Sequence, residues 1–217
     1  MCIDGYNIDV ETIPPAIKRA VGRPRAFDRD AALDRALELF WRHGFEGTST
    51  AQLTEAMGIS PPSLYAAFGS KEALHREAVA LYLRRHGGFL ATPLAEPGPA
   101  RVAIERVLFS AARQFAQPEH PAGCMVSCAE LQVSPASAAA AATMTELRQA
   151  AQQAIRVRLD AARASGELAK ESDTATLAAY FAGVIQGMAV QARDGVRAPQ
   201  LKRLAAVAMR AWPNADQ

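Results

Sequence analysis

The sequence has few aromatic residues and no segment that alternates apolar and polar residues over the length of a strand. Aromatic residues make up 6% of the 217 residues, which disfavours a sheet because aromatic and β-branched side chains build strands. Alanine, the strongest helix former, is abundant, and half of the residues are hydrophobic. This composition excludes wholesale disorder and predicts an all-α globular protein.

Cysteine is also scarce. The three cysteines, Cys2, Cys124 and Cys128, cannot all pair within one chain, and acidic residues such as Asp4 and Asp9 interrupt any secretory segment. We therefore expect a reducing, cytoplasmic setting. The uncharged stretch 174–192 approaches the length of a membrane span, but it contains threonines, glutamines and two glycines. A helix buried in an interface, with no membrane partner, is the better interpretation.

Charge of either sign is not in large excess, since 24 basic residues face 22 acidic ones. Residues 18–29 are different, because this short stretch holds five basic residues and one acidic residue. Catalytic patterns are missing as well: the chain has no glycine-rich phosphate loop, and its four histidines are scattered. The sequence thus predicts no enzyme activity, no catalytic residues, no metal site and no cofactor.

Start and stop signals predict four helices in the first half of the chain. Each begins after an N-capping Asp or Ser, and glycines follow the first three. Ser49 and Gln52 have the spacing of a capping box, and Pro61 stands where a missing N–H does no harm. The expected helices are 28–43, 50–57, 61–68 and 71–90, and periodic apolar residues predict further helices at 100–117, 123–133, 135–165, 173–194 and 199–212.

The two short helices have the spacing of a helix-turn-helix motif. Six apolar residues can close a small core beneath them: Leu37, Phe40, Leu53, Met57, Leu64 and Phe68. The second short helix then presents an outer face of small residues, which permits close approach to the major groove of DNA.

At these positions the chain resembles a known family. Residues 23–71 resemble the N-terminal domain of TetR-family transcriptional regulators, in the runs Phe45-Glu46-Gly47-Thr48-Ser49, Met57-Gly58-Ile59-Ser60 and Phe68-Gly69-Ser70-Lys71. The resemblance implies a dimeric, TetR-like fold of about nine helices, with a three-helix helix-turn-helix domain and a C-terminal helical bundle. The implied division is an N-terminal arm (1–22), a DNA-binding domain (23–75) and a ligand-binding and dimerisation domain (76–217).

The resemblance also implies which residues contact an operator. Thr50, Tyr65 and Lys71 would bind phosphates, which fixes register without reading sequence. The face of the second short helix would read bases through Ser60, Ser63, Ala66 and Ala67. That face carries no Arg, Asn or Gln, so we expect thymine methyl contacts, serine hydroxyls and DNA shape to discriminate between sequences.

The basic stretch supplies a second expected DNA contact. Arg23 and Arg25 flank a proline directly before the first helix, and arginines on a thin arm can enter a narrow minor groove. The alternative is a solvated basic tail.

The second half of the chain predicts a homodimer. Gly183 and Gly187 share a helix face with Ala179, so a partner helix can pack closely, and Leu204 belongs to a matching apolar stripe. A dimer places two recognition helices about 34–36 Å apart and predicts a palindromic operator.

A cavity for a small-molecule effector is implied by the resemblance. The candidate lining residues are large and apolar, and each of them also fits an ordinary core. They are Phe109, Phe115, Met125, Met144, Phe181 and Met188.

Two alternatives to a ligand-responsive repressor stay open. Cys124 and Cys128 are four residues apart, as in a thiol-reactive sensor, although free cysteine usually behaves as a small buried apolar residue. His120 lies four residues before them, but Pro121 and Gly123 interrupt the helix that a zinc site would need. The second alternative is a helical enzyme or carrier with a vestigial DNA-binding domain.

Overall fold

Capping interactions decide where the N-terminal helices begin. The structure is a computed structural model that describes residues 28–213. Asp28 accepts hydrogen bonds from the first amides of α1 (Arg29–His43), and Ser49 forms a complete capping box with Gln52 at the start of α2 (Thr50–Met57). Ser60 and Ser70 cap α3 (Pro61–Phe68) and α4 (Lys71–His86) through their hydroxyls. The predicted bounds of α2 and α3 are confirmed.

Glycines end the same helices. Gly58 adopts a left-handed conformation after α2, with φ 66°, and its N–H bonds back to the last turn. Gly69 has φ 84° after α3. Backbone of this kind costs other residues energy because Cβ crowds the carbonyl oxygen. Glycines in the local sequence therefore determine the turns on either side of α3.

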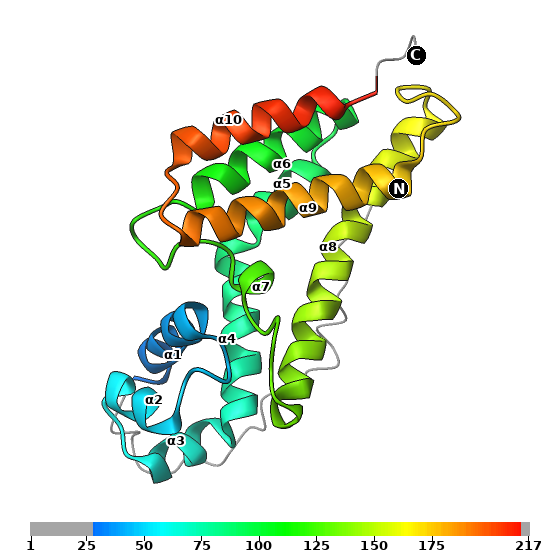
Figure 1. Cartoon of the computed structure of the whole chain (residues 1–217). Helices are drawn as coiled ribbons and strands as arrows, with labels where there is room; N and C mark the ends of the chain where they lie inside the picture. The colour runs from blue at the N-terminus through cyan, green and yellow to red at the C-terminus, as the bar shows by residue number, and fades with distance from the viewer. Residues whose placement is uncertain (1–27, 214–217) are drawn as a thin grey trace.

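The rest of the described chain is helical and forms a larger body. It consists of α5 (Gly88–Ala95), α6 (Ala100–Gln114), the single turn α7 (Met125–Cys128), α8 (Ala138–Ala164), α9 (Thr174–Arg193) and α10 (Ala198–Ala208), with short 3-10 turns before α8 and after α10. Figure 1 shows α1 to α3 at one end of the molecule, with α4 running from them into the body. No strand occurs in the part of the chain that the structure describes, so the all-α prediction is confirmed.

Three helix predictions in the body need correction. The helix expected at 71–90 ends at His86, and a separate helix begins at Gly88 after the turn at Gly87. That helix contains a proline, Pro93. The helix expected at 199–212 ends at Ala208, where a short 3-10 turn begins. The helix expected at 123–133 shrinks to Met125–Cys128, because Ala129 is extended and Glu130 has a positive φ of 51°.

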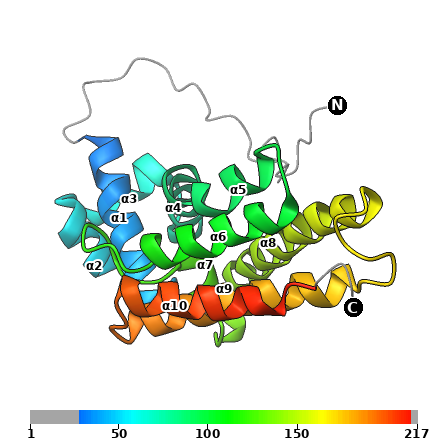
Figure 2. The ribbon, with the colours of Figure 1, turned by 90° about the horizontal axis from the view of Figure 1, so that it is seen from above.

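One continuous apolar core joins the two parts. It runs from α1 through α4 into α6, α8 and α9, and its largest fully buried side chains include Trp41, Tyr82, Phe115 and Phe181. Figure 2 shows α6 with α5 on one side and with α9 and α10 on the other, and α10 packs against both α6 and α9. The division expected between residues 75 and 76 falls within α4, which is continuous from the DNA-binding end to the body.

Candidate nucleic-acid interface and internal cavity

The small core expected beneath the helix-turn-helix is present. Leu53, Leu64 and Phe40 are completely buried, and Leu37, Met57 and Phe68 are at most 6% exposed. These side chains fix α3 against α1 and α2, so one face of α3 packs inward. The opposite face is left on the surface.

That outer face carries small side chains and one tyrosine. Ser60 and Ala66 are exposed, Ser63 and Ala67 are half-buried, and Tyr65 is 49% exposed. The hydroxyls of Ser60 and Ser63 lie 2.9 Å apart, and Ser60 Oγ also accepts from the Ser63 amide. The pair is thus fixed by the cap, and whichever hydroxyl donates to the other, Ser63 Oγ keeps a lone pair that can accept another hydrogen bond.

Two of the expected phosphate ligands lie at the starts of the helices before and after α3. Thr50 is half-buried at the first turn of α2, and Lys71 is half-buried at the first turn of α4. The Lys71 ammonium lies 4.2 Å from the centroid of the Phe45 ring. Burial lowers the pKa of Lys71 from its ordinary value, while Glu72 and Glu46 oppose that change. Arg23 and Arg25 lie outside the described residues.

Arg29 is a residue of this region that sequence reasoning missed. Its guanidinium forms an ion pair with Glu77 at 2.7 Å, donates to the carbonyl of Ala67 and stacks over the Phe68 ring at 4.3 Å. One side chain therefore ties α1, α3 and α4 together. Its place directly after the N-cap gives no sequence signal for this role.

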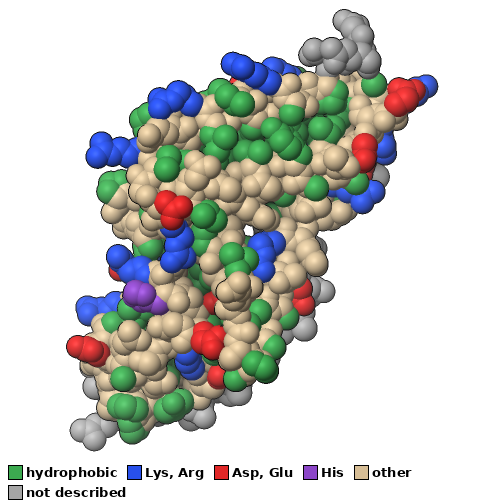
Figure 3. All heavy atoms as spheres, viewed as in Figure 1, with side chains coloured by type: hydrophobic (Ala, Val, Ile, Leu, Met, Phe, Trp, Pro, Cys, Tyr) green, Lys and Arg blue, Asp and Glu red, His purple; other side chains and the backbone are tan. Residues whose placement is uncertain are grey.

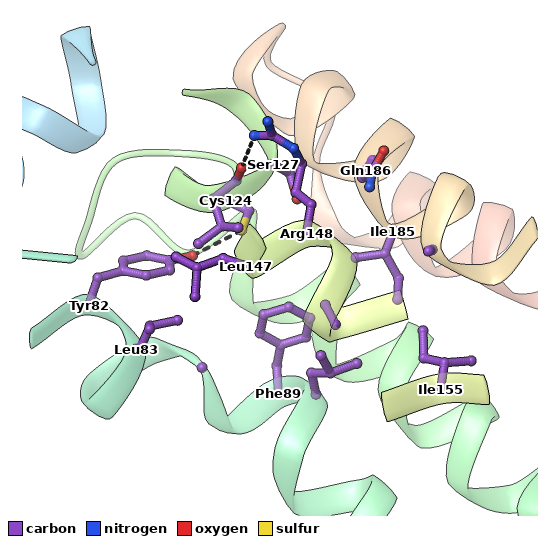
Figure 4. A pocket seen from close by; sticks show the side chains of 15 residues that line it. Tyr82, Leu83, Phe89, Cys124, Ser127, Leu147, Arg148, Ile155, Ile185 and Gln186 are labelled. Carbon is purple, nitrogen blue, oxygen red and sulfur yellow. Dashed lines mark hydrogen bonds between the residues drawn. The ribbon is translucent and has the colours of Figure 1, made fainter. Parts of the chain in front are cut away.

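The body contains a cavity of about 550 Å³, counting the space open to solvent. Most of its wall is apolar and comes from α4, α5, α8 and α9, including Phe89, Leu147 and Ile155. Figure 4 shows these side chains around the hollow, with Cys124, Ser127, Arg148 and Gln186 among the groups that line it. A largely apolar cavity with a few polar groups is typical of a small-molecule site.

None of the six residues predicted from the sequence lines this cavity. Five of them are fully buried in the core and the sixth, Phe109, is half-buried against it. The five are Phe115, Met125, Met144, Phe181 and Met188. The structure instead surrounds the cavity with other apolar residues and a few polar ones, which lie on one face each of α8 (Leu147, Ala151 and Ile155) and α9 (Ala182, Ile185 and Gln186).

One of the two described cysteines, Cys124, belongs to the wall of this cavity. Cys124 is buried and lines the cavity, and its Sγ accepts a hydrogen bond from the Tyr82 hydroxyl at 3.2 Å. Cys128 is half-buried and its pKa is raised, chiefly by burial. Both are free thiols. Within residues 28–213, no three His, Cys, Asp or Glu side chains gather as a metal site would require.

Known proteins resemble the chain both in sequence and in structure. The sequence model described as "Bacterial regulatory proteins, tetR family" matches residues 32–78. The HTH-type transcriptional repressor ComR of Escherichia coli K12 is 36% identical over 200 residues, which cover 91% of this chain and 94% of ComR. The HTH-type transcriptional repressor BdcR of the same organism is 42% identical over 108 residues, covering 50% of this chain and 55% of BdcR.

A solved structure shares the fold over most of the chain. The TetR family transcriptional regulator CifR, a cysteine mutant in complex with 26-base-pair double-strand operator DNA, superposes with a TM-score of 0.84 at 44% identity. The match covers 88% of this chain and 100% of CifR.

Proposed function

The chain belongs to the TetR family of bacterial transcriptional regulators, and we propose that it represses transcription by binding double-stranded operator DNA through α3. The observation that supports this most directly is the exposed, small-residue face of α3, which is fixed by caps on both sides. The similarity of the whole chain to a relative solved on its operator supports it as well. A helix with such a face fits the major groove closely.

Phosphate contacts hold the protein in register. Thr50 and Lys71 are the first residues of α2 and α4, and Tyr65 lies within α3; from these positions a hydroxyl or ammonium reaches the sugar-phosphate backbone. Lys71 would leave the Phe45 ring to meet a phosphate. Base discrimination then depends on Ser60, Ser63, Ala66 and Ala67, together with Arg23 and Arg25 from the arm.

The protein acts as a homodimer through α9 and α10. Ala179, Gly183 and Val190 are exposed along one face of α9, and no neighbouring atom lies within 4 Å of a Cβ built at Gly183 or Gly187. By length and composition α9 could cross a membrane. Only 39% of its apolar stretch is buried within the chain, so a large part of that stretch is left for a partner to cover. Figure 3 shows hydrophobic side chains gathered over the face that α9 and α10 form. A second copy packed on this face, with Leu204 of α10 at its margin, removes that surface from water.

A small apolar effector in the cavity releases the DNA. Binding favours the arrangement of the two subunits in which the recognition helices no longer match adjacent major grooves. A cytoplasmic location follows from access to the chromosome.

Selection of duplexes from a random DNA pool tests the proposal. We expect a palindromic consensus with half-sites about one helical turn apart, and sedimentation of a dimer at micromolar concentration. In Lys71→Gln the logarithmic salt dependence of operator binding should fall by about one per half-site, and in Arg23→Ala with Arg25→Ala it should fall further. The variant Lys170→Gln, in the turn between α8 and α9, is the matched control. Failure to enrich any duplex, or a monomer, contradicts the proposal.

A thiol-reactive regulator is the second candidate, and the position of Cys124 in the cavity wall favours it. A reactive compound that enters the cavity would meet this thiol beside the Tyr82 hydroxyl. Alkylation of the wild-type protein and of Cys124→Ser separates the candidates. Release of DNA from the wild type alone supports thiol chemistry, whereas unchanged affinity after modification of Cys124 eliminates it.

A further inference from the structure

Three hydrogen bonds from the body end on one short segment of the DNA-binding unit. Arg193 at the end of α9 donates to the carbonyl of Arg42 at 2.8 Å, and the amide of Ser134 donates to Glu46 Oε2 at 2.9 Å. Between them, Glu130 Oε1 accepts from the Phe45 amide at 2.5 Å. Residues 42–46 form the end of α1 and the turn that leads into α2. The body therefore holds the helix-turn-helix at this turn.

Glu130 is an unusual residue for such a contact. Its side chain is almost fully buried, and it is the one non-glycine residue within 28–213 that has a positive φ. A Cβ at Gly44 would lie 3.3 Å from its Oε1, so the glycine leaves room for the carboxyl group. Its second oxygen, Oε2, is buried without a hydrogen-bond partner. Backbone strain and an unsatisfied buried oxygen both cost stability, which points to a role other than stabilising the fold.

The surroundings of Glu130 limit how it can move. The His75 ring packs edge-on against Phe40 and Phe45, and His75 Nε2 lies 3.9 Å from Glu130 Oε1 without a hydrogen bond of its own. The carboxyl group thus sits between the turn at Phe45 and the buried face of α4. Movement of Glu130 would therefore change the contacts of the turn at Phe45 and of the buried face of α4.

The residue before Glu130 is held from the cavity side. Arg148 on α8 lines the cavity, and its Nη1 donates to the carbonyl of Val126 at 2.9 Å and to that of Ala129 at 3.4 Å. Val126 and Ser127 line the cavity too. Figure 4 shows Arg148 reaching from α8 across to the α7 segment. One guanidinium therefore links the wall of the cavity to the strained turn at Glu130.

We propose that Glu130 is a positioning residue that transmits the occupancy of the cavity to the helix-turn-helix. This inference depends on the proposed ligand-responsive repressor. A bound molecule that draws the Arg148 guanidinium toward the cavity takes a donor from the Ala129 carbonyl. The backbone at 129–130 then relaxes, and Glu130 no longer accepts the hydrogen bond from the Phe45 amide. The turn before α2 thereby loses a contact with the body. Because coupling is reciprocal, operator DNA that fixes α2 lowers the affinity of the cavity for such a molecule.

Amide hydrogen exchange of the dimer without DNA tests the link directly. Glu130→Ala should raise the exchange rate of the Phe45 amide about tenfold or more, since that amide loses a charged acceptor. Arg148→Ala removes the donor to the Ala129 carbonyl from the cavity side. It should raise the exchange rate of the Phe45 amide severalfold. Arg156→Ala is the matched control and should leave this exchange rate unchanged, because it removes the same side chain from α8 at a residue that pairs with Asp160 on the same helix.

The double variant decides whether the two residues act in series. In the Glu130→Ala background, Arg148→Ala should add nothing to exchange at Phe45 or to the loss of affinity for the selected duplex. Independent, additive effects overturn the proposal, and so does an Arg148→Ala protein whose Phe45 amide exchanges at the wild-type rate. If Glu130→Ala does not fold, Glu130→Gln keeps the size and one acceptor oxygen, and the same comparison is made in that background. If the protein selects no DNA duplex, the proposed function is wrong. The exchange measurements, which need no DNA, still test whether Arg148 and Glu130 are coupled to the Phe45 amide.

Discussion

The two parts of the molecule are specified in different ways. In the DNA-binding unit, residues 28–70, helices of eight to fifteen residues begin at side-chain caps and end at glycines. In the body, α6, α8 and α10 begin without a hydrogen bond from an N-cap side chain, and their places depend on packing. Short helices are marginal on their own, so local signals must be strong where the buried area per helix is small. The comparison predicts that helix caps contribute more to the stability of the DNA-binding unit than to that of the body, and that apolar contacts stabilise both parts.

The largest effect should come from the core that both parts share. Leu64→Ala should lower the free energy of unfolding by about 2–5 kcal/mol, because Leu64 is completely buried and the deletion leaves a cavity. Urea denaturation at fixed protein concentration measures it. Leu131→Ala, at a residue that is 62% exposed, is the control and should change stability by less than about 0.5 kcal/mol. A separate early transition for the unit in Leu64→Ala would show that the core does not couple the two parts.

The same contrast explains what the sequence could predict. Ser49, Gly58, Ser60 and Gly69 act on their immediate neighbours, so α2 and α3 were predictable to the residue. The end of the helix expected at 123–133 was not, because Glu130 bonds to Phe45, which is 85 residues away. No local pattern marks such a contact.

The cavity shows the limit of sequence reasoning most clearly. The family resemblance implied a cavity with large apolar residues as candidates for its lining, yet Phe181 and Met188 are completely buried in the core. Other apolar residues such as Leu147 and Ile155 line it instead, together with Arg148 and Gln186. A cavity is space left by the relative placement of helices, and that placement is a long-range property of the fold.

A second effect, of about 2 kcal/mol, should appear on acidification. Burial, with Lys71 and Arg76 nearby, lowers the pKa of His75 from 6.5 to about 4. The unfolded chain therefore binds a proton between these values that the folded protein does not, so stability falls as pH drops from 6.5 toward 4. At pH 5 the loss is about 2 kcal/mol, at about 1.4 kcal/mol for each pKa unit.

The His75 contribution must be separated from that of Glu130. Burial raises the pKa of Glu130, so acidification relieves the cost of its charge and acts in the opposite direction. Urea denaturation at several pH values, for the wild type and for His75→Gln, isolates the histidine by difference. His43→Gln, at an exposed residue, is the control. Parallel curves for the wild type and His75→Gln would contradict the prediction.

Loss of a cap should have a smaller effect. Ser49→Ala should lower the free energy of unfolding by about 1 kcal/mol, because the Gln52 amide loses its acceptor at the start of α2. Ser49→Gly should cost only a few tenths of a kcal/mol, since glycine tolerates the cap conformation and lets water reach the amide. Equal losses for the two variants would mean that side-chain capping is not what fixes α2.

The smallest effect should come from an ion pair on the surface between α1 and α4. Arg85 Nη1 lies 2.6 Å from Asp34 Oδ1, but both side chains are more than two-fifths exposed, so water and salt screen their attraction. A double-mutant cycle with Arg85→Ala and Asp34→Ala should give a coupling energy of about 0.5 kcal/mol or less. The same cycle on Arg29 and Glu77, whose pair is less exposed and in which Arg29 Nη2 donates to both carboxylate oxygens, should give about 1 kcal/mol or more. If the exposed pair couples as strongly as the shielded one, the attachment of α1 to α4 depends on surface charge rather than on the apolar core and the Arg29 contacts.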